Sequence, residues 1–247
     1  MRYSTEELFF EKPNGQKIAV KVFRPSEEEK QYPTVIFSHG FGANYRALEH
    51  HGHGFSENGI VCIFFDFCGG GMDSFSDGSM LEMTVLTEVD DLKFMMDEVQ
   101  KLPYVDGDNL FLIGESMGGF VSAYVAAEVP KLTKGLILWY PAFIIPDDAK
   151  MRFEEGLNVA LGMRLSPDFS KVAKEIDIFS MIATYKAPVR IIHGDHDPIV
   201  PISYSQRAIE VYENAELTVI EGAAHGFDGD DSEYAREISI DFIKTLR

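Results

Sequence analysis

A serine between two glycines is the residue of this chain best placed to do chemistry. Ser116 lies in the run GESMG at residues 114–118, after the apolar run 109–113 and before a helical pattern. A sharp turn from strand to helix brings neighbouring backbone close, and only glycine at positions 114 and 118 leaves room for that backbone. The turn exposes the hydroxyl next to backbone N–H groups at a helix N-terminus. This context predicts a nucleophilic serine, although the pentapeptide alone also recurs in ordinary glycine-rich turns.

Two downstream loops supply the other groups that a serine nucleophile requires. Asp197 follows an apolar strand pattern near 187–193, and His225 follows another near 216–221. A serine hydroxyl is a weak nucleophile until a base takes its proton. His225 is expected to be that base, and Asp197 is expected to hold its imidazole in the correct tautomer and to stabilise the imidazolium.

Four motifs in a fixed order make the chain resemble a known superfamily. The order Ser116, Asp197, His225 is that of α/β-hydrolases and differs from the orders of the chymotrypsin and subtilisin types. The motifs are HGFG at 39–42, GESMGG at 114–119, GDHDPIVP at 194–201 and GAAHGF at 222–227. The chain thus resembles the α/β-hydrolase superfamily over essentially its whole length. Within it, the chain looks most similar to bacterial carboxylesterases, including the cinnamoyl (feruloyl) esterase group.

The resemblance implies further roles. It places one oxyanion donor at the backbone N–H of Phe41, in the HGFG turn, and the other at the backbone N–H of Met117, the residue after the nucleophile. It also favours Asp197 over the nearby Asp195, because the acid of the family precedes an apolar-Val-Pro stretch such as the one at 198–201.

Two positions depart from the cinnamoyl esterase pattern. Glu115 stands where these esterases often carry histidine, and DFCGGG at 66–71 replaces their DxxGHG-type loop. The motifs therefore specify the superfamily more firmly than the substrate.

The spacing of apolar residues along the chain predicts the strands and helices that must position these residues. Residues 7–12 and 17–23 flank a Pro-Asn-Gly turn and predict a hairpin. After that, strand and helix patterns alternate, which predicts right-handed crossovers and a mostly parallel sheet with helices on both faces. The expected strands are 33–38, 60–67, 109–114, 135–141, 187–193 and 216–221, and the expected helices are 43–57, 84–101, 117–128, 203–214 and 231–246. The sequence therefore predicts an α/β-hydrolase fold, with the chemistry at the carboxyl ends of the strands.

One connection is too long for a simple crossover. Loops of more than about 15 residues without structure are uncommon in compact domains, so residues 143–186 are expected to form a small helical cap. The core of the same domain would then be residues 1–142 and 187–247. Phe143 and Ile145 follow the preceding strand directly, and we expect them to line the substrate pocket.

Composition narrows the class of protein. The chain has 247 residues, 45% of them hydrophobic, and a formal charge of −18, which disfavours nucleic acid and acidic membrane surfaces as partners. There is no apolar run long enough to span a membrane and no apolar signal core. Cys62 and Cys68 would lie too far apart along an extended strand to form a disulfide unless the chain folded back. A reduced, cytoplasmic location is the expectation.

Other chemistry-bearing residues are assigned structural roles. His50, His51 and His53 lack metal-ligand spacing and are expected to face solvent on a helix. Cys68 lacks the context of a nucleophile, and His39 is expected to be a buried scaffold residue. Residues 69–71 form no phosphate loop, because no Lys-Ser/Thr follows them. No metal and no organic cofactor is expected.

The sequence therefore predicts a serine carboxylesterase that hydrolyses small acyl or aryl esters, among them acetyl or hydroxycinnamoyl esters, through an acyl-enzyme. Its partner would be the small-molecule substrate, with homo-oligomerisation left open. A serine peptidase of the aminopeptidase or prolyl-oligopeptidase type shares the same catalytic groups and is the alternative. A non-catalytic binding member of the fold is disfavoured, because no residue of the Ser-His-Asp set is missing.

Overall fold

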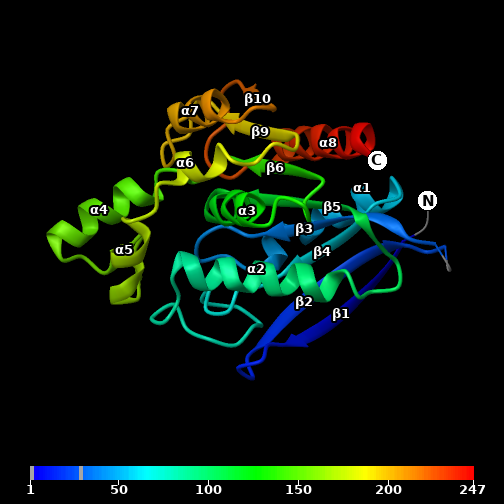
Figure 1. The fold of residues 1–247 in the computed structure, drawn as a ribbon, viewed down its shortest axis with the longest axis horizontal. Helices are drawn as coiled ribbons and strands as arrows, with labels where there is room; N and C mark the ends of the chain where they lie inside the picture. The colour runs from blue at the N-terminus through cyan, green and yellow to red at the C-terminus, as the bar shows by residue number, and fades with distance from the viewer. Residues whose placement is uncertain (1–2, 28–29) are drawn as a thin grey trace.

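An eight-stranded sheet forms the centre of the molecule (Figure 1). The computed structural model describes residues 3–27 and 30–247, and its strands lie in the order β1-β2-β4-β3-β5-β6-β9-β10. The first two pairings in this order are antiparallel and the other five are parallel, so the mostly parallel sheet is confirmed. The strands are β1 (Tyr3–Glu11), β2 (Lys17–Pro25), β3 (Tyr32–Ser38), β4 (Val61–Phe65), β5 (Val105–Glu115), β6 (Gly135–Trp139), β9 (Val189–Gly194) and β10 (Ala215–Ile220).

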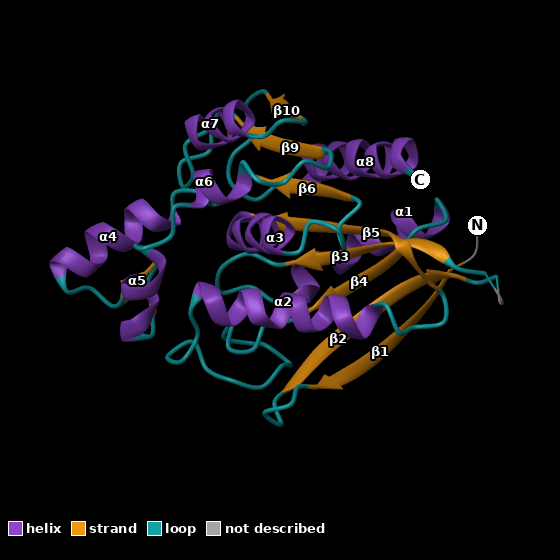
Figure 2. Cartoon of the chain, in the orientation of Figure 1, coloured by secondary structure: helices purple, strands orange, loops and turns teal. Residues whose placement is uncertain are grey.

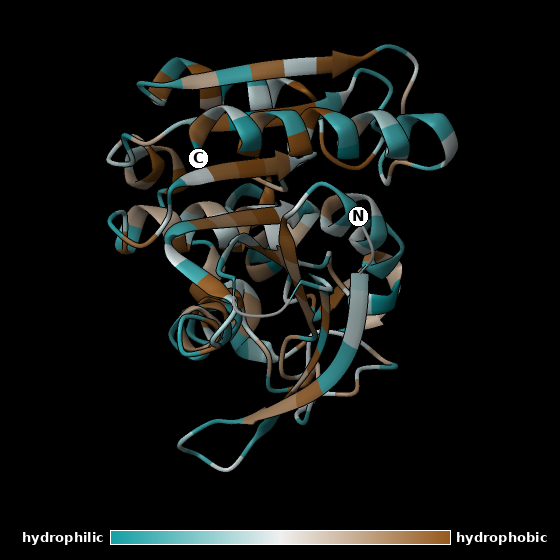
Figure 3. Ribbon diagram, turned by 90° about the vertical axis from the view of Figure 1, so that its right-hand side faces the viewer, coloured by the Kyte–Doolittle hydropathy of each residue, from teal (hydrophilic) through white to brown (hydrophobic). Residues whose placement is uncertain are grey.

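Helices cover both faces of this sheet (Figure 2). Alternate residues of each strand point to opposite faces, so Leu112 packs with one cluster of buried side chains and Phe111 with the other. The first cluster includes side chains from α2 (Val85–Val99), α3 (Ser116–Glu128), α6 (Ile178–Ile182) and α7 (Ser203–Val211), and the second includes side chains from α1 (Gly52–Glu57) and α8 (Gly229–Leu246). Figure 3 shows the apolar colouring concentrated on the strands between these helices.

The helix expected over residues 43–57 is broken in the structure. Two short 3₁₀ turns, Tyr45–Ala47 and Glu49–His51, precede α1. Gly52 opens α1 where a side chain would collide with the ring of Phe23, so the chain packs against β2 at a distance that only glycine allows. The sequence pattern shows the apolar spacing but not this close approach.

The inserted segment, residues 143–186, projects beyond the carboxyl ends of the strands (Figure 1). It contains α4 (Ile145–Glu155) and α5 (Pro167–Ala173) as well as α6. A short hairpin of β7 (Val159–Ala160) and β8 (Met163–Arg164) was not expected. Its turn residues Leu161 and Gly162 both have positive φ, of 48° and 80°, as a tight two-residue hairpin turn requires.

None of the helices in residues 3–27 and 30–247 combines the length and the apolar character needed to cross a membrane.

Candidate active site

Ser116 lies at the turn between β5 and α3, with a backbone φ of 49°. A side chain at position 114 would collide with the backbone of Gly118, and one at position 118 would collide with the carbonyl of Ser38. Glycine at both positions lets β5, β3 and the start of α3 meet this closely. The strain at Ser116 holds its hydroxyl outward at the carboxyl end of the sheet, as the sequence pattern predicts.

The structure brings Ser116, His225 and Asp197 together from three loops. His225 Nε2 lies 3.0 Å from Ser116 Oγ, and His225 Nδ1 lies 2.7 Å from Asp197 Oδ2. An ionised carboxylate only accepts hydrogen bonds, so Nδ1 carries a proton and donates a hydrogen bond to Asp197. Nε2 then accepts the Ser116 hydroxyl. This is the tautomer in which a histidine can remove a proton from a serine.

The side chain of Asp197 is fully buried and is surrounded by hydrogen-bond donors. Its Oδ1 accepts the backbone N–H groups of Ile199 and Val200 at 2.8 and 2.9 Å. Burial alone would raise the pKa of Asp197, but the hydrogen bonds from His193, His225 and these two amides hold that pKa well below its usual value. The carboxylate therefore stays ionised across the range in which His225 can act as a base.

Asp195 lies in a different environment, although it is only two residues away. It is partly exposed, accepts the backbone N–H of Gly222 at 2.6 Å and contacts the exposed His196 at 2.8 Å. It contacts neither His225 nor Ser116. Its hydrogen bond joins the loop after β9 to the loop after β10.

His193 is a residue at this site that the sequence reasoning missed. It is buried at the end of β9, and its Nε2 lies 3.1 Å from Asp197 Oδ2 and 3.0 Å from the carbonyl of Val200. Because a carbonyl only accepts, Nε2 carries the proton, and Nδ1 accepts the Ser205 hydroxyl at 2.7 Å. Two histidines thus donate to the same oxygen of Asp197. The available signal was a histidine in a buried strand, four residues before the acid.

The backbone N–H groups of Phe41 and Met117 have no acceptor within the described part of the chain. Both residues line the cavity beside Ser116. The turn that carries Phe41 is fixed by His39, whose Nδ1–H donates to the Gly40 carbonyl at 2.9 Å and whose Nε2 accepts the Phe67 N–H at 3.1 Å. Burial lowers the pKa of His39, which keeps it neutral in this scaffold role.

Glu115 connects the turn that carries Ser116 to two other parts of the site. Its Oε1 accepts the backbone N–H of Gly40 at 3.1 Å, and its Oε2 accepts the Tyr140 hydroxyl at 2.6 Å. The Tyr140 ring meets the ring of His225 edge to face, with centroids 4.8 Å apart. Burial raises the pKa of Tyr140 well above its usual value, and the neighbouring Glu115 carboxylate adds to this. Neither contact could be anticipated from sequence spacing.

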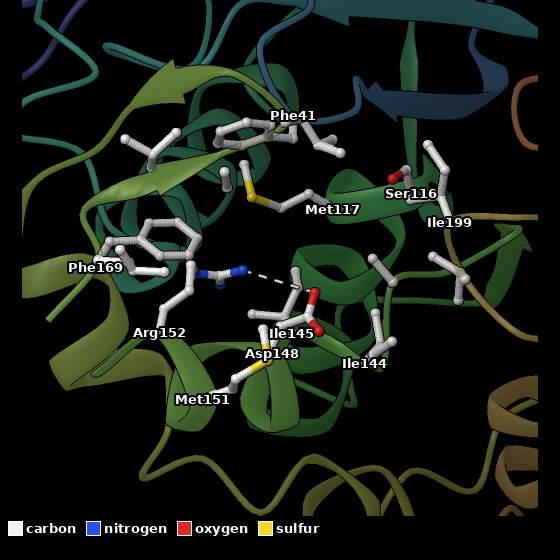
Figure 4. A pocket seen from close by; sticks show the side chains of 16 residues that line it. Phe41, Ser116, Met117, Ile144, Ile145, Asp148, Met151, Arg152, Phe169 and Ile199 are labelled. Carbon is white, nitrogen blue, oxygen red and sulfur yellow. Dashed lines mark ion pairs between the residues drawn. The ribbon is translucent and has the colours of Figure 1, made fainter. Parts of the chain in front are cut away.

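A cavity of about 310 Å³ opens from Ser116 towards the inserted segment (Figure 4). Its walls are mostly apolar and come from Phe41, Met117, α4, α5, the β7–β8 hairpin and the loop after β9. Ile145 lines it, as expected, but Phe143 does not. Phe143 is buried beneath it, with its ring centroid 5.8 Å from that of Phe179 and 6.5 Å from that of Phe120. Closeness in sequence to a strand end does not fix the direction of a side chain.

One charged pair interrupts the apolar wall. Arg152 Nη1 lies 3.6 Å from Asp148 Oδ2, one helical turn away on α4. Figure 4 shows both side chains on the inserted-segment side of the cavity, across from Ser116.

The remaining sequence candidates lie away from this cavity. His51 is buried instead of exposed, with Nε2 3.4 Å from Ser232 Oγ and its ring edge-on to Trp139. Cys62 and Cys68 are both free, and burial raises the pKa of Cys68 to about 12. Within residues 3–27 and 30–247, no three His, Cys, Asp or Glu side chains gather in a way that could hold a metal ion.

Comparison with known proteins agrees with this architecture. Residues 29–180, more than half of the chain, match a hydrolase family described as serine aminopeptidase, S33. The structure of Est1E from Butyrivibrio proteoclasticus with bound ferulic acid superposes with a TM-score of 0.85, at 26% identity, covering 97% of this chain and 98% of that one. The α/β-hydrolase fold predicted from the sequence is therefore confirmed.

Two mouse proteins are similar in sequence. Monoglyceride lipase is 28% identical over 177 residues, 68% of this chain and 56% of its own length. The mitochondrial palmitoyl-protein thioesterase ABHD10 is 25% identical over 213 residues, 76% of this chain and 66% of its own length. This chain thus spans less than two thirds of either relative.

Proposed function

This chain belongs to the hydrolase family described as serine aminopeptidase, S33, and we propose that it is a serine carboxylesterase acting on small acyl or aryl esters. The observation that carries this proposal is the continuous set of contacts from Ser116 through His225 to Asp197, at 3.0 and 2.7 Å, at the mouth of a mostly apolar cavity. Such a cavity suits an uncharged ester better than it suits the charged end of a peptide.

In the proposed first step, Ser116 Oγ attacks the ester carbonyl carbon while its proton passes to His225 Nε2. The carbonyl oxygen becomes an oxyanion and accepts the backbone N–H groups of Phe41 and Met117. Losing one such donor typically costs about 3–4 kcal/mol of transition-state stabilisation. The intermediate then collapses, the C–O bond to the alcohol breaks, and the alcohol leaves with the proton from His225.

In the second step, His225 takes a proton from water, and the resulting hydroxide attacks the acyl carbon. When the second tetrahedral intermediate collapses, the bond between the acyl carbon and Ser116 Oγ breaks, His225 returns its proton to Oγ, and the acid departs. Asp197 keeps its charge throughout and stabilises the imidazolium in both halves. No metal or organic cofactor takes part in this scheme.

We further propose that residues 143–186 act as a cap, because α4, α5 and the β7–β8 hairpin supply most of the cavity wall facing Ser116. Acetyl and hydroxycinnamoyl esters are the proposed substrates. The likeness to a protein whose structure holds bound ferulic acid supports the second of these.

A serine aminopeptidase is the second candidate, favoured by the description of the family. Such an enzyme needs a free carboxylate to bind a substrate ammonium group. Within the described residues that line the cavity, Asp148 is the acidic side chain, and the Arg152 guanidinium 3.6 Å away offsets its charge without a close hydrogen bond. That pairing favours the esterase.

The test is a panel of p-nitrophenyl acyl esters, methyl ferulate and aminoacyl anilides, run with the wild type and Ser116→Ala. We expect ester turnover by the wild type alone, with a fluorophosphonate labelling Ser116. Faster turnover of the anilides would assign the peptidase. Ester turnover that persists in Ser116→Ala would rule out the proposed nucleophile.

A further inference from the structure

Arg152 is the unusual residue of the substrate cavity. Its side chain is 10% exposed, yet it carries a permanent charge within a wall made largely of aliphatic and aromatic groups. A buried charge is costly unless it is paired and hydrogen-bonded. Ligand pockets commonly place a few polar groups among apolar ones to orient the ligand. The contacts of Arg152 therefore indicate whether all of its N–H donors have acceptors within the protein.

The protein satisfies Arg152 incompletely. A guanidinium group has five N–H donors. Here Nε donates to Ser170 Oγ at 3.4 Å, and Nη1 lies 3.6 Å from Asp148, which is beyond good hydrogen-bond distance. The guanidinium carbon, Cζ of Arg152, lies 5.9 Å from the centre of the Phe169 ring. Figure 4 shows the guanidinium directed into the cavity. Beyond the contacts with Ser170 and Asp148, its N–H groups have no acceptor among the described residues.

The local charges select the kind of ligand group. Arg152 and Asp148 together are neutral, and the whole chain carries −18. A carboxylate at this end would face both the Asp148 carboxylate and the net negative field. An uncharged oxygen would accept from Arg152 without that repulsion, and hydrogen bonds to charged donors are stronger than those between neutral groups.

We propose that Arg152 is a specificity-determining residue that selects esters whose buried chain ends in an uncharged hydrogen-bond acceptor, such as a ketone, ether or hydroxyl oxygen. This rests on the esterase function proposed above and names its substrate class. The reacting carbonyl lies at Ser116, and the acceptor lies at the opposite side of the cavity beside α4. Esters with a wholly apolar chain leave these donors of Arg152 without a partner.

A purely structural role for Arg152 makes a different prediction. Arg152 also links α4 to α5 through Ser170, so removing it could weaken the cap. Loss of that link would slow all esters by a similar factor. Loss of a specificity contact would change the ratio between matched substrates. Ser170→Ala is the matched control, because it removes the link but retains the guanidinium facing the cavity.

The experiment uses p-nitrophenyl esters of four to ten carbons and the matching alkyl butyrates, each paired with analogues carrying a terminal methyl ether or a terminal carboxylate. For the wild type we expect the ether to exceed its apolar partner in kcat/KM by about 10- to 100-fold at one chain length. Arg152→Met should remove that preference, and Ser170→Ala should keep it. Either the acyl or the alcohol series can show the effect.

Equal rates for ether and apolar chains in both series of the wild type would overturn the proposal, as would an unchanged ratio in Arg152→Met. A preference for the carboxylate would overturn the assignment of an uncharged group. If none of the esters is turned over, the esterase function itself fails. Ester turnover that requires Ser116 but lacks the ether preference would instead leave that function in place.

Discussion

Replacing Asp197 with asparagine tests how the structure activates His225. Oδ1 of Asp197 accepts two backbone N–H groups, so the amide oxygen of an asparagine would take the same position. The NH₂ group would then lie where Oδ2 now accepts from His225 and His193. To accept from this NH₂, His225 must move its proton from Nδ1 to Nε2. In that tautomer it cannot take the proton of Ser116.

The expected size of the effect follows from this change of tautomer. The equivalent substitution in a serine protease lowers kcat about 10⁴-fold while leaving the geometry intact. That factor corresponds to about 5 kcal/mol in the activation barrier. We expect a loss of this order in Asp197→Asn, measured as kcat on a p-nitrophenyl ester, with KM changed little. Fluorophosphonate labelling of Ser116 should slow in parallel.

Asp195→Asn is the matched control. The Asp195 carboxylate accepts from Gly222 and contacts His196, both outside the Ser116–His225 contact. Its amide can still accept the Gly222 N–H, so we expect kcat to stay within about threefold of the wild type, since a surface substitution of this kind costs little free energy. Circular dichroism would verify that both variants are folded. An Asp195→Asn variant more impaired than Asp197→Asn would refute the assignment of the acid.

Three further predictions concern the surroundings of the site. Tyr140→Phe removes the donor to Glu115 but keeps the ring against His225, so kcat should fall about 10-fold with KM nearly constant; an unchanged kcat would show that this contact positions nothing. Burial lowers the pKa of His51 from 6.5 to about 3, so the unfolded chain binds the extra proton and stability is lost as pH falls through that window. Urea titrations at a series of pH values give the free energy of unfolding as a function of pH. Below pH 6.5 this free energy should change less steeply in His51→Gln than in the wild type, by up to about 1.4 kcal/mol per pH unit, and an identical pH dependence would contradict this. Ile145→Ala should shift acyl-length preference by about 1–3 kcal/mol, whereas Phe143→Ala should lower stability by about 3–5 kcal/mol and leave preference unchanged.

The parts of the fold that the sequence predicted are those determined by local pattern. The buried strands read correctly because their apolar runs are bounded by turn residues, and β5 continues into α3 as the pattern at Ser116 requires. The break before α1 and the β7–β8 hairpin were missed. The first depends on the packing of Gly52 against Phe23, and the second on a turn whose leucine adopts a positive φ. Neither property appears in the periodicity.

The same division applies to the candidate site. The residues placed beside Ser116 by sequence order were predictable because parallel strands all end at one edge of the sheet. Contacts between side chains were not predictable, because they depend on the direction in which each side chain points from that edge. Phe143 turns into the core, whereas Ile145, two residues on, faces the cavity. His193 points from a buried strand towards Asp197 instead of into the apolar cluster.

Glu115 shows why the departure from the cinnamoyl esterase pattern matters physically. β5 and β6 are paired with Glu115 opposite Trp139, so Ser116 and Tyr140 begin neighbouring turns, and both have positive φ, at 49° and 36°. Such conformations cost about 1–3 kcal/mol each and persist only where surrounding contacts hold them. The Ala142 N–H donates to the Ser116 carbonyl, and Glu115 binds the Tyr140 hydroxyl. Because the other Glu115 oxygen accepts the N–H of Gly40, just before Phe41, one carboxylate connects the strained backbone to the turn that carries the proposed oxyanion donor. A histidine at position 115 cannot accept two hydrogen bonds at once, so a chain carrying one must hold these turns by other contacts.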